Sequence, residues 1–180
     1  MLRKVLVAAF VVFVGLAWDA YAQDARTQDL VSSLDKVKYK KKDKGSISIE
    51  VYVNIKNDVA LRAPSEYSGN YTSEDAENNL MLKVDGTGFV TGSGVDYLND
   101  RRLGFTLKDV SISGALLTGT KVYDNGDERK FEAVFVNRTV ETGKNAGEIT
   151  SRDTKFGLGF IQRNESASNN WVNRVFLERR

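Results

Sequence analysis

Apolar and polar residues alternate along much of the chain, with a period of two residues. The clearest case is residues 46–56, SISIEVYVNIK, in which every second position is apolar: Ile47, Ile49, Val51, Val53 and Ile55. Successive side chains of a β-strand point to opposite faces of a sheet, so this pattern predicts a half-buried strand. Shorter runs of the same kind recur to the end of the chain. We therefore predict an all-β fold with one short N-terminal helix at most.

Glycine and Asp-Asn clusters separate these apolar runs. Glycine recurs through residues 67–95, where a tightly curved sheet needs positive φ angles or bulges. Residues 124–127, Asp-Asn-Gly-Asp, predict a hairpin turn, and a change of parity predicts a β-bulge near Asp109. Sequential hairpins predict an antiparallel meander closed into a small eight- to nine-stranded barrel, with a β-sandwich as the alternative.

A different pattern precedes these strands. Leu30, Val31, Leu34 and Val37 are spaced as on one face of a helix, which predicts a short amphipathic helix. The lysine-rich run Lys36–Lys44 follows, and we expect it to be a mobile basic linker. These residues form a polar and basic N-terminal segment, 23–45, ahead of a single barrel domain, 46–180.

The first 22 residues have the organisation of a secretory signal peptide. A basic start at Arg3 and Lys4 is followed by an apolar stretch, 5–17, and by the small residues Ala20 and Ala22. The stretch is shorter than the roughly 20 residues that span a bilayer, which argues against a membrane anchor. We expect cleavage after Ala22 and a periplasmic or secreted protein.

The composition restricts the chemistry that the chain can perform. There is no cysteine and no histidine, which excludes disulfides, thiol nucleophiles, Ser-His-Asp triads and zinc sites built on these residues. No residue pattern indicates a catalytic group, a metal site or a cofactor. An enzyme that uses carboxylates remains a less favoured alternative. The formal net charge of +2 gives no overall field that would attract nucleic acid.

One stretch resembles a known group of proteins. Gly69-Asn70-Tyr71, followed by LMLKVDGTGFVTGSG, resembles the opening hairpins of calycin-type barrels, the lipocalin and avidin-like group, over residues 69–95. The resemblance implies a barrel with a ligand site in its interior.

The functional prediction is a non-catalytic binding or interaction module. Its partner would be a small hydrophobic ligand or a protein, and Lys36–Lys44 could contact an anionic surface. A small outer-membrane barrel is the main alternative. If a ligand enters the barrel, aromatic side chains at alternate strand positions would line its site. The candidates are Tyr71, Phe89, Phe105, Tyr123 and Phe135.

Overall fold

The structure, a computed structural model, describes residues 25–44, 47–98, 100–163 and 172–180. The predicted signal peptide, residues 1–22, lies outside them. The described residues form a helix over residues 25–34, a 3-10 turn and ten strands, so the predicted all-β class with one short helix is confirmed. The elements are β1 (Lys36–Lys44), β2 (Ile47–Val59), η1 (Pro64–Tyr67), β3 (Gly69–Thr72), β4 (Asn79–Val84), β5 (Val90–Leu98), β6 (Arg101–Ser113), β7 (Leu116–Tyr123), β8 (Glu128–Gly143), β9 (Ile149–Arg163) and β10 (Val172–Arg179).

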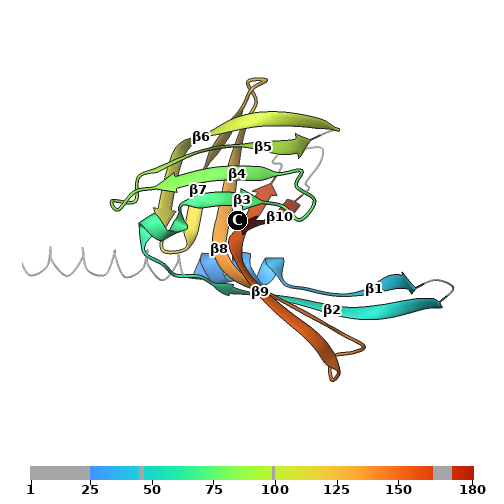
Figure 1. Cartoon of the computed structure of the whole chain (residues 1–180). Coiled ribbons are helices and arrows are strands. Elements are labelled where there is room, and N and C mark those ends of the chain that lie inside the picture. Colours follow the sequence, from blue (N-terminus) through green and yellow to red (C-terminus); the bar gives the residue numbers. More distant parts are fainter. Residues whose placement is uncertain (1–24, 45–46, 99, 164–171) are drawn as a thin grey trace, which may run out of the picture.

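Strands β3 to β10 close into an eight-stranded barrel. Each pairs antiparallel with the next along the chain, and β10 returns to pair with β3 through Arg179 and Tyr71. The predicted closed meander is thus confirmed, and the sandwich alternative is not (Figure 1). Closure removes the free edge where these strands pair, but the β10–β3 contact spans only two residue pairs, and β9 from Ile149 to Phe156 is paired with β8 alone.

Strands β8 and β9 are longer than the barrel wall, and their far ends extend the same sheet beyond the barrel, where the two N-terminal strands join it. Up to Val134, one edge of β8 pairs with β7; from Val136 to Gly143 the same edge pairs with β2, which in turn pairs with β1. We call this four-stranded extension the wing: β1, β2, residues 136–143 of β8 and residues 149–155 of β9. Figure 1 shows β1 and β2 running away from the barrel.

Phe135 marks the point at which the wing leaves the barrel. Its amide donates to the Ala115 carbonyl at 2.9 Å, and its carbonyl accepts from the Ala60 amide at 2.9 Å. One residue of β8 therefore bonds both to the residue that precedes β7 and to the residue that follows β2. This arrangement satisfies the Phe135 backbone groups where the ladder changes partner.

The N-terminal helix covers the outside of the barrel at β9. Its buried side chains fall at helical spacing: Thr27, Leu30, Val31 and Leu34. Leu34 packs against Gly159, which pairs with Val134, so the helix lies on the face opposite to that of Phe135. Arg26 donates to Glu132 on the same outer face. The amphipathic pattern therefore predicted the helix and the buried positions of Leu30, Val31 and Leu34. It was wrong for Val37, which lies in β1 and is 61% exposed.

The expectation of a mobile linker over residues 36–44 was wrong. Every residue from Lys36 to Lys44 is paired with a residue of β2, from Ile55 back to Ile47. Strand pairing uses backbone groups, and an edge strand tolerates lysine because its side chains remain in water. β1 has no alternating apolar pattern of its own, and it forms a strand by pairing with β2, which has one.

The hairpin between β4 and β5 turns on one glycine with a left-handed conformation. Gly88 has a φ of 86°, and its amide donates to the Asp85 carbonyl at 3.1 Å. The hairpin predicted at residues 124–127 has the same form, with Gly126 at a φ of 87°. The predicted bulge is also present, between Lys108 and Ser111, and Asp109 there has a φ of 51°. In both hairpin turns, glycine occupies the position that needs a positive φ.

Two glycines in the first of these turns provide a matched test. Gly88→Ala is expected to lower the free energy of unfolding by about 1–2 kcal/mol, because a Cβ is disfavoured at positive φ. Gly86 has no positive φ and nothing within 4 Å of an added Cβ, so Gly86→Ala is expected to be neutral or slightly stabilising. Urea denaturation followed by circular dichroism measures both. Equal effects would contradict the assigned turn conformation.

Candidate functional site

A buried polar cluster lies inside the barrel. Lys121 of β7 donates from Nζ to Oδ2 of Asp96 in β5 at 2.7 Å, and the Tyr123 hydroxyl donates to the same oxygen at 2.6 Å. The three residues are 3%, 5% and 3% exposed, respectively. Buried ion pairs are uncommon in apolar cores because both charges lose their hydration. This cluster is therefore the most unusual chemistry in the described part of the chain.

The strand period explains why these groups point inward. In β7, Lys121 has the same parity as buried Leu117 and Tyr123, and in β5 Asp96 has the same parity as Gly94. Gly94 leaves room here, because a Cβ would lie 2.8 Å from Cζ of Phe105 and would clash with the Asn79 carbonyl oxygen. The sequence analysis missed Lys121 and Asp96. The signal was present: both are charged residues at the inward parity of their strands.

Aromatic rings complete the surroundings of the lysine. Nζ of Lys121 lies 4.4 Å from the centroid of the Phe105 ring and 4.5 Å from that of Phe160. Burial lowers the pKa of Lys121, while the charge and hydrogen bond of Asp96 oppose that effect. The Asp96 carboxylate and the two ring faces therefore stabilise the ammonium form that burial alone would disfavour.

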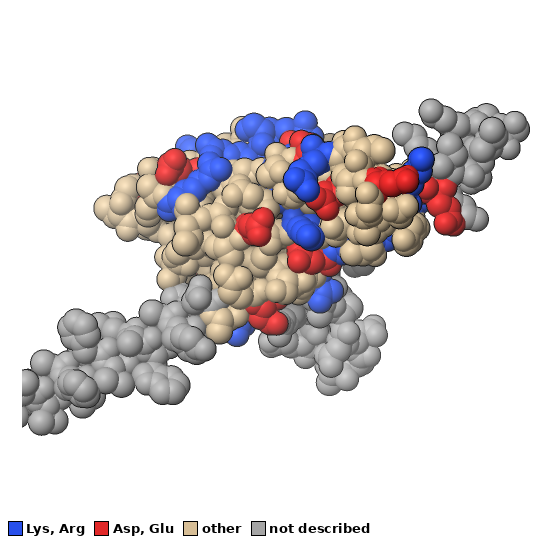
Figure 2. All heavy atoms as spheres, turned by 90° about the horizontal axis from the view of Figure 1, so that it is seen from below, with Lys and Arg blue, Asp and Glu red and all other residues tan. Residues whose placement is uncertain are grey.

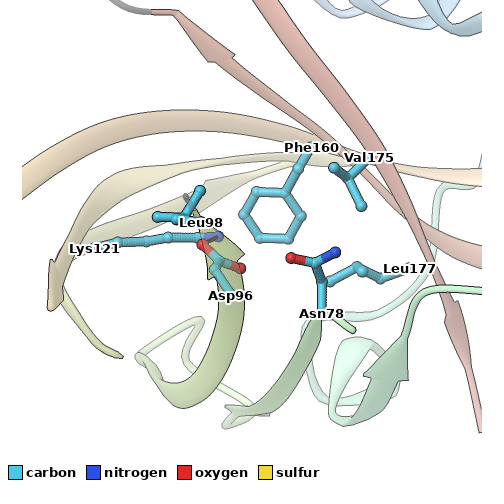
Figure 3. Close-up of a pocket in the computed structure, with 7 residues that line it drawn as sticks. All are labelled: Asn78, Asp96, Leu98, Lys121, Phe160, Val175 and Leu177. Carbon is cyan, nitrogen blue, oxygen red and sulfur yellow. Dashed lines mark hydrogen bonds and ion pairs between the residues drawn. The ribbon is translucent and has the colours of Figure 1, made fainter. Parts of the chain in front are cut away.

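A small cavity adjoins this ion pair. Figure 3 shows Asp96 and Lys121 meeting beside it, with Phe160 and Asn78 nearby; its lining residues are Asn78, Asp96, Leu98, Lys121, Phe160, Val175 and Leu177. Its volume is about 10 Å³, which is room for roughly one water molecule. A substrate does not fit beside the lysine in this conformation. Within the described ranges, no group of three or more acidic residues is placed to hold a metal ion.

Four of the five aromatic candidates for ligand contact lie inside the barrel. Phe105 and Tyr123 meet edge to face at 5.8 Å between ring centroids, and Tyr71 and Phe135 lie 6.1 Å apart. All four are buried, whereas Phe89 is 67% exposed, next to Gly88 in the β4–β5 turn. The structure thus places the candidates in two interior pairs and one surface position.

The second interior pair closes the other end of the barrel. Tyr67 of η1 stacks on Phe135 with 4.0 Å between ring centroids, and the Tyr71 hydroxyl donates to the Tyr67 carbonyl at 2.6 Å. Burial raises the pKa of Tyr71 to about 12, since the phenolate would lose its hydration. The Tyr67 hydroxyl in turn donates to the Ala60 carbonyl. Side chains and η1 together fill this end.

The wing carries the second candidate site, on β1. Lys36, Lys38 and Lys40 alternate with Val37 and Tyr39, whose exposed fractions are 61% and 60%. None of these three lysines forms an ion pair with an acidic residue of the described chain. Partial burial lowers the pKa of Lys38, and repulsion from Lys40 and Lys36 lowers it further. Lys36, Lys38 and Lys40 of β1 are thus a row of like charges, none of which forms an ion pair with another described residue.

Elsewhere on the surface, opposite charges are mixed. Figure 2 shows basic side chains gathered along one edge of the molecule, with basic and acidic side chains mixed over the rest of that face. Several are paired, among them Arg152 with Glu141 and Lys155 with Glu178. Because such pairs cancel each other at a distance, the three lysines of β1, which form no ion pair, differ from these paired groups.

No helix among the described residues is long and apolar enough to cross a bilayer. Comparisons with known proteins add no relative to this picture: no protein-family model, no curated protein and no solved structure matches the chain.

Proposed function

We propose that the protein is an exported, disulfide-free interaction module that binds an anionic partner through β1 of the wing and has no catalytic activity. Export rests on the signal-peptide pattern of residues 1–22. The observation that carries the proposal is the row of Lys36, Lys38 and Lys40, none of which has an ion-pair partner among the described residues. An anionic partner would supply a counter-charge.

The geometry of a strand makes this row an extended positive surface. Side chains two positions apart lie on the same face and are about 7 Å apart. Three lysines at this spacing repel each other, and this repulsion adds to the larger effect of burial in lowering the pKa of Lys38. A partner with several negative charges would relieve this repulsion and gain attraction at each lysine. A single small anion would contact only part of the row, so the proposal favours an extended partner.

The interior cluster supports a non-catalytic role. Lys121 is the buried nucleophilic candidate, but it is paired with Asp96, and the adjoining cavity holds about 10 Å³. A lysine nucleophile needs a neutral amine and access for its substrate. The ion pair with Asp96 favours the charged amine, and the small cavity leaves no access for a substrate. We assign the cluster to the packing of the barrel interior.

The distribution of side chains on the barrel wall also bears on the outer-membrane alternative. In β4, Leu80 and Leu82 are buried inside while Met81 and Lys83 face outward and are exposed. Outer-membrane barrels have the reverse arrangement, with an apolar outer band and a polar lumen. The arrangement of side chains on β4 therefore favours a barrel whose outer surface faces water rather than lipid.

Neutralising the lysine row tests the proposal. The triple variant Lys36→Gln, Lys38→Gln, Lys40→Gln is expected to weaken binding to immobilised poly-L-glutamate about 100-fold, since each lysine near an anionic surface contributes about 1 kcal/mol. The measurement is the dissociation constant at fixed ionic strength, with the mature chain. Higher salt should weaken binding of the wild-type chain more than binding of the variant.

A second triple variant controls for the loss of charge. Lys83→Gln, Lys108→Gln and Lys130→Gln removes three exposed lysines from the barrel wall and leaves the net charge equal to that of the first variant. It is expected to change the dissociation constant less than threefold. If both variants weaken binding equally, overall charge rather than the wing is responsible and the proposal fails.

A small apolar ligand inside the barrel is the second candidate function. The closed eight-stranded meander favours it and is compatible with the resemblance to the lipocalin and avidin-like group, but aromatic side chains fill the interior, so a ligand would have to displace them. Titration with a hydrophobic fluorescent probe should then saturate at one site per chain, and Phe105→Ala should change the affinity. A signal without saturation would exclude an interior site.

A further inference from the structure

The outer edge of β1 is free within the described residues. β1 pairs along all nine of its residues with β2 and with no other strand. Along its other edge, alternate residues direct their amide and carbonyl groups away from the sheet. Such an edge is a template on which another extended segment can pair.

The two faces of β1 differ in chemistry. Lys36, Lys38 and Lys40 point to one face, and Val37 and Tyr39 point to the other. The Tyr39 ring lies edge to face with Tyr52 of β2, at 5.6 Å between centroids, and still leaves 60% of Tyr39 exposed. A strand added at the free edge would extend both faces. Its own side chains would lie beside lysines on one face and beside valine and tyrosine on the other.

This pattern argues against a second copy of the chain as the occupant. Two β1 edges paired antiparallel would bring lysine next to lysine on the same face. Like charges directly opposite each other destabilise a strand pair, and lysine on edge strands is a common means of preventing self-association. The same lysines would attract a strand with acidic residues. The lysines of β1 therefore disfavour pairing with a second copy of the chain and favour pairing with an acidic segment.

From these observations we infer that the free edge of β1 binds an extended acidic peptide segment as an added strand. Acidic side chains of the segment lie beside Lys36, Lys38 and Lys40, and apolar side chains at the alternate positions lie beside Val37 and Tyr39. Backbone hydrogen bonds to the edge supply affinity, and the alternation supplies specificity. The inference rests on the proposed function and specifies its partner as a protein segment rather than a lipid surface.

Three synthetic nine-residue peptides of equal charge test this inference. The first alternates glutamate and valine, the second has the same composition with the glutamates in one block, and the third is the first with its central amides N-methylated, which removes the donors needed for strand pairing. The measurement is fluorescence anisotropy with the mature chain. The alternating peptide is expected to bind at least tenfold more tightly than either of the others.

A variant of the apolar face adds a second readout. Tyr39→Ser should weaken binding of the alternating peptide several-fold and leave binding of the blocked peptide unchanged. Urea denaturation of the variant checks that the wing is intact. This result would support an added strand, because an unstructured polyanion makes no use of the face that carries Tyr39.

The failures of the two proposals are distinguishable. If all three peptides bind equally and the Lys36, Lys38 and Lys40 triple variant weakens all of them, the strand model is overturned and the anionic interaction stands. If vesicles with anionic lipid bind through these lysines and no peptide does, the partner is a lipid surface and the inference is overturned. If neither poly-L-glutamate nor any peptide binds, both proposals fail.

Discussion

Asp96→Ala is expected to lower the free energy of unfolding by about 3–5 kcal/mol. The change removes the carboxylate that accepts from Lys121 at 2.7 Å and from Tyr123 at 2.6 Å. Both donors are buried, and the ammonium of Lys121 would lose its counter-charge in a low-dielectric interior. Urea denaturation at pH 7, followed by far-ultraviolet circular dichroism, gives the difference in free energy.

The pH dependence of the variant identifies the cause. Burial already lowers the pKa of Lys121 below that of the unfolded chain, and the loss of Asp96 lowers it further. Between the folded and unfolded pKa values the unfolded chain binds the extra proton, so stability rises with pH in that range. The difference in the free energy of unfolding between the wild-type chain and Asp96→Ala is therefore expected to become smaller between pH 7 and pH 10.

A double variant is the control for the ion pair. Asp96→Ala with Lys121→Met removes both charges and keeps an apolar chain in place of the lysine, and it should recover most of the lost stability. In a double-mutant cycle the two changes are then far from additive. Additive effects, or a deficit that does not change with pH, would contradict the view that an unpaired buried charge causes the loss.

Phe135→Ala is expected to cost about 3–5 kcal/mol in the free energy of unfolding. The ring is fully buried, stacks on Tyr67 at 4.0 Å, and lies 6.2 Å from the ring of Phe156. Its removal leaves a cavity where η1 closes the barrel. It also loosens the residue whose backbone connects the barrel to the wing. The measurement is again urea denaturation.

Phe89→Ala is the matched control. The same side-chain atoms are removed, but Phe89 is 67% exposed, so the change should remain within about 0.5 kcal/mol. If Phe135→Ala costs less than 1 kcal/mol, the packing described at that end of the barrel is wrong. The pair also separates two residues that the sequence pattern placed in one group.

Local patterns were sufficient to predict several individual elements. The alternation in residues 46–56 predicted a strand there, and helical spacing of Leu30, Val31 and Leu34 predicted the helix. The bulge near Asp109 followed from the change of parity alone. In each case the signal lies within a few neighbouring residues, where strand and helix periods act directly on the apolar pattern.

The wing and the buried ion pair depend on contacts between distant residues. β1 has lysine at most positions, so its strand state comes from pairing with β2, which no local pattern of β1 predicts. That Lys121 faces inward could be read from its parity, but its contact with Asp96 requires the order of strands in the closed barrel. At Phe135, β8 changes its pairing partner from β7 to β2. The local sequence does not predict this change either, because β2 and β8 are far apart in the chain.

The pairing of β2 with β8 has a consequence for the order in which the chain can fold. Val59 pairs with Val136, so β2 reaches its position in the wing only after most of the barrel has been synthesised. Non-local pairings of this kind form late, because a long loop must close first. A chain threaded through a translocation channel from its N-terminus, as proposed here for export, would thus keep β2 without its β8 partner during transit, although β1 and β2 can pair with each other locally. Late assembly of the wing would then coincide with arrival on the far side of the membrane.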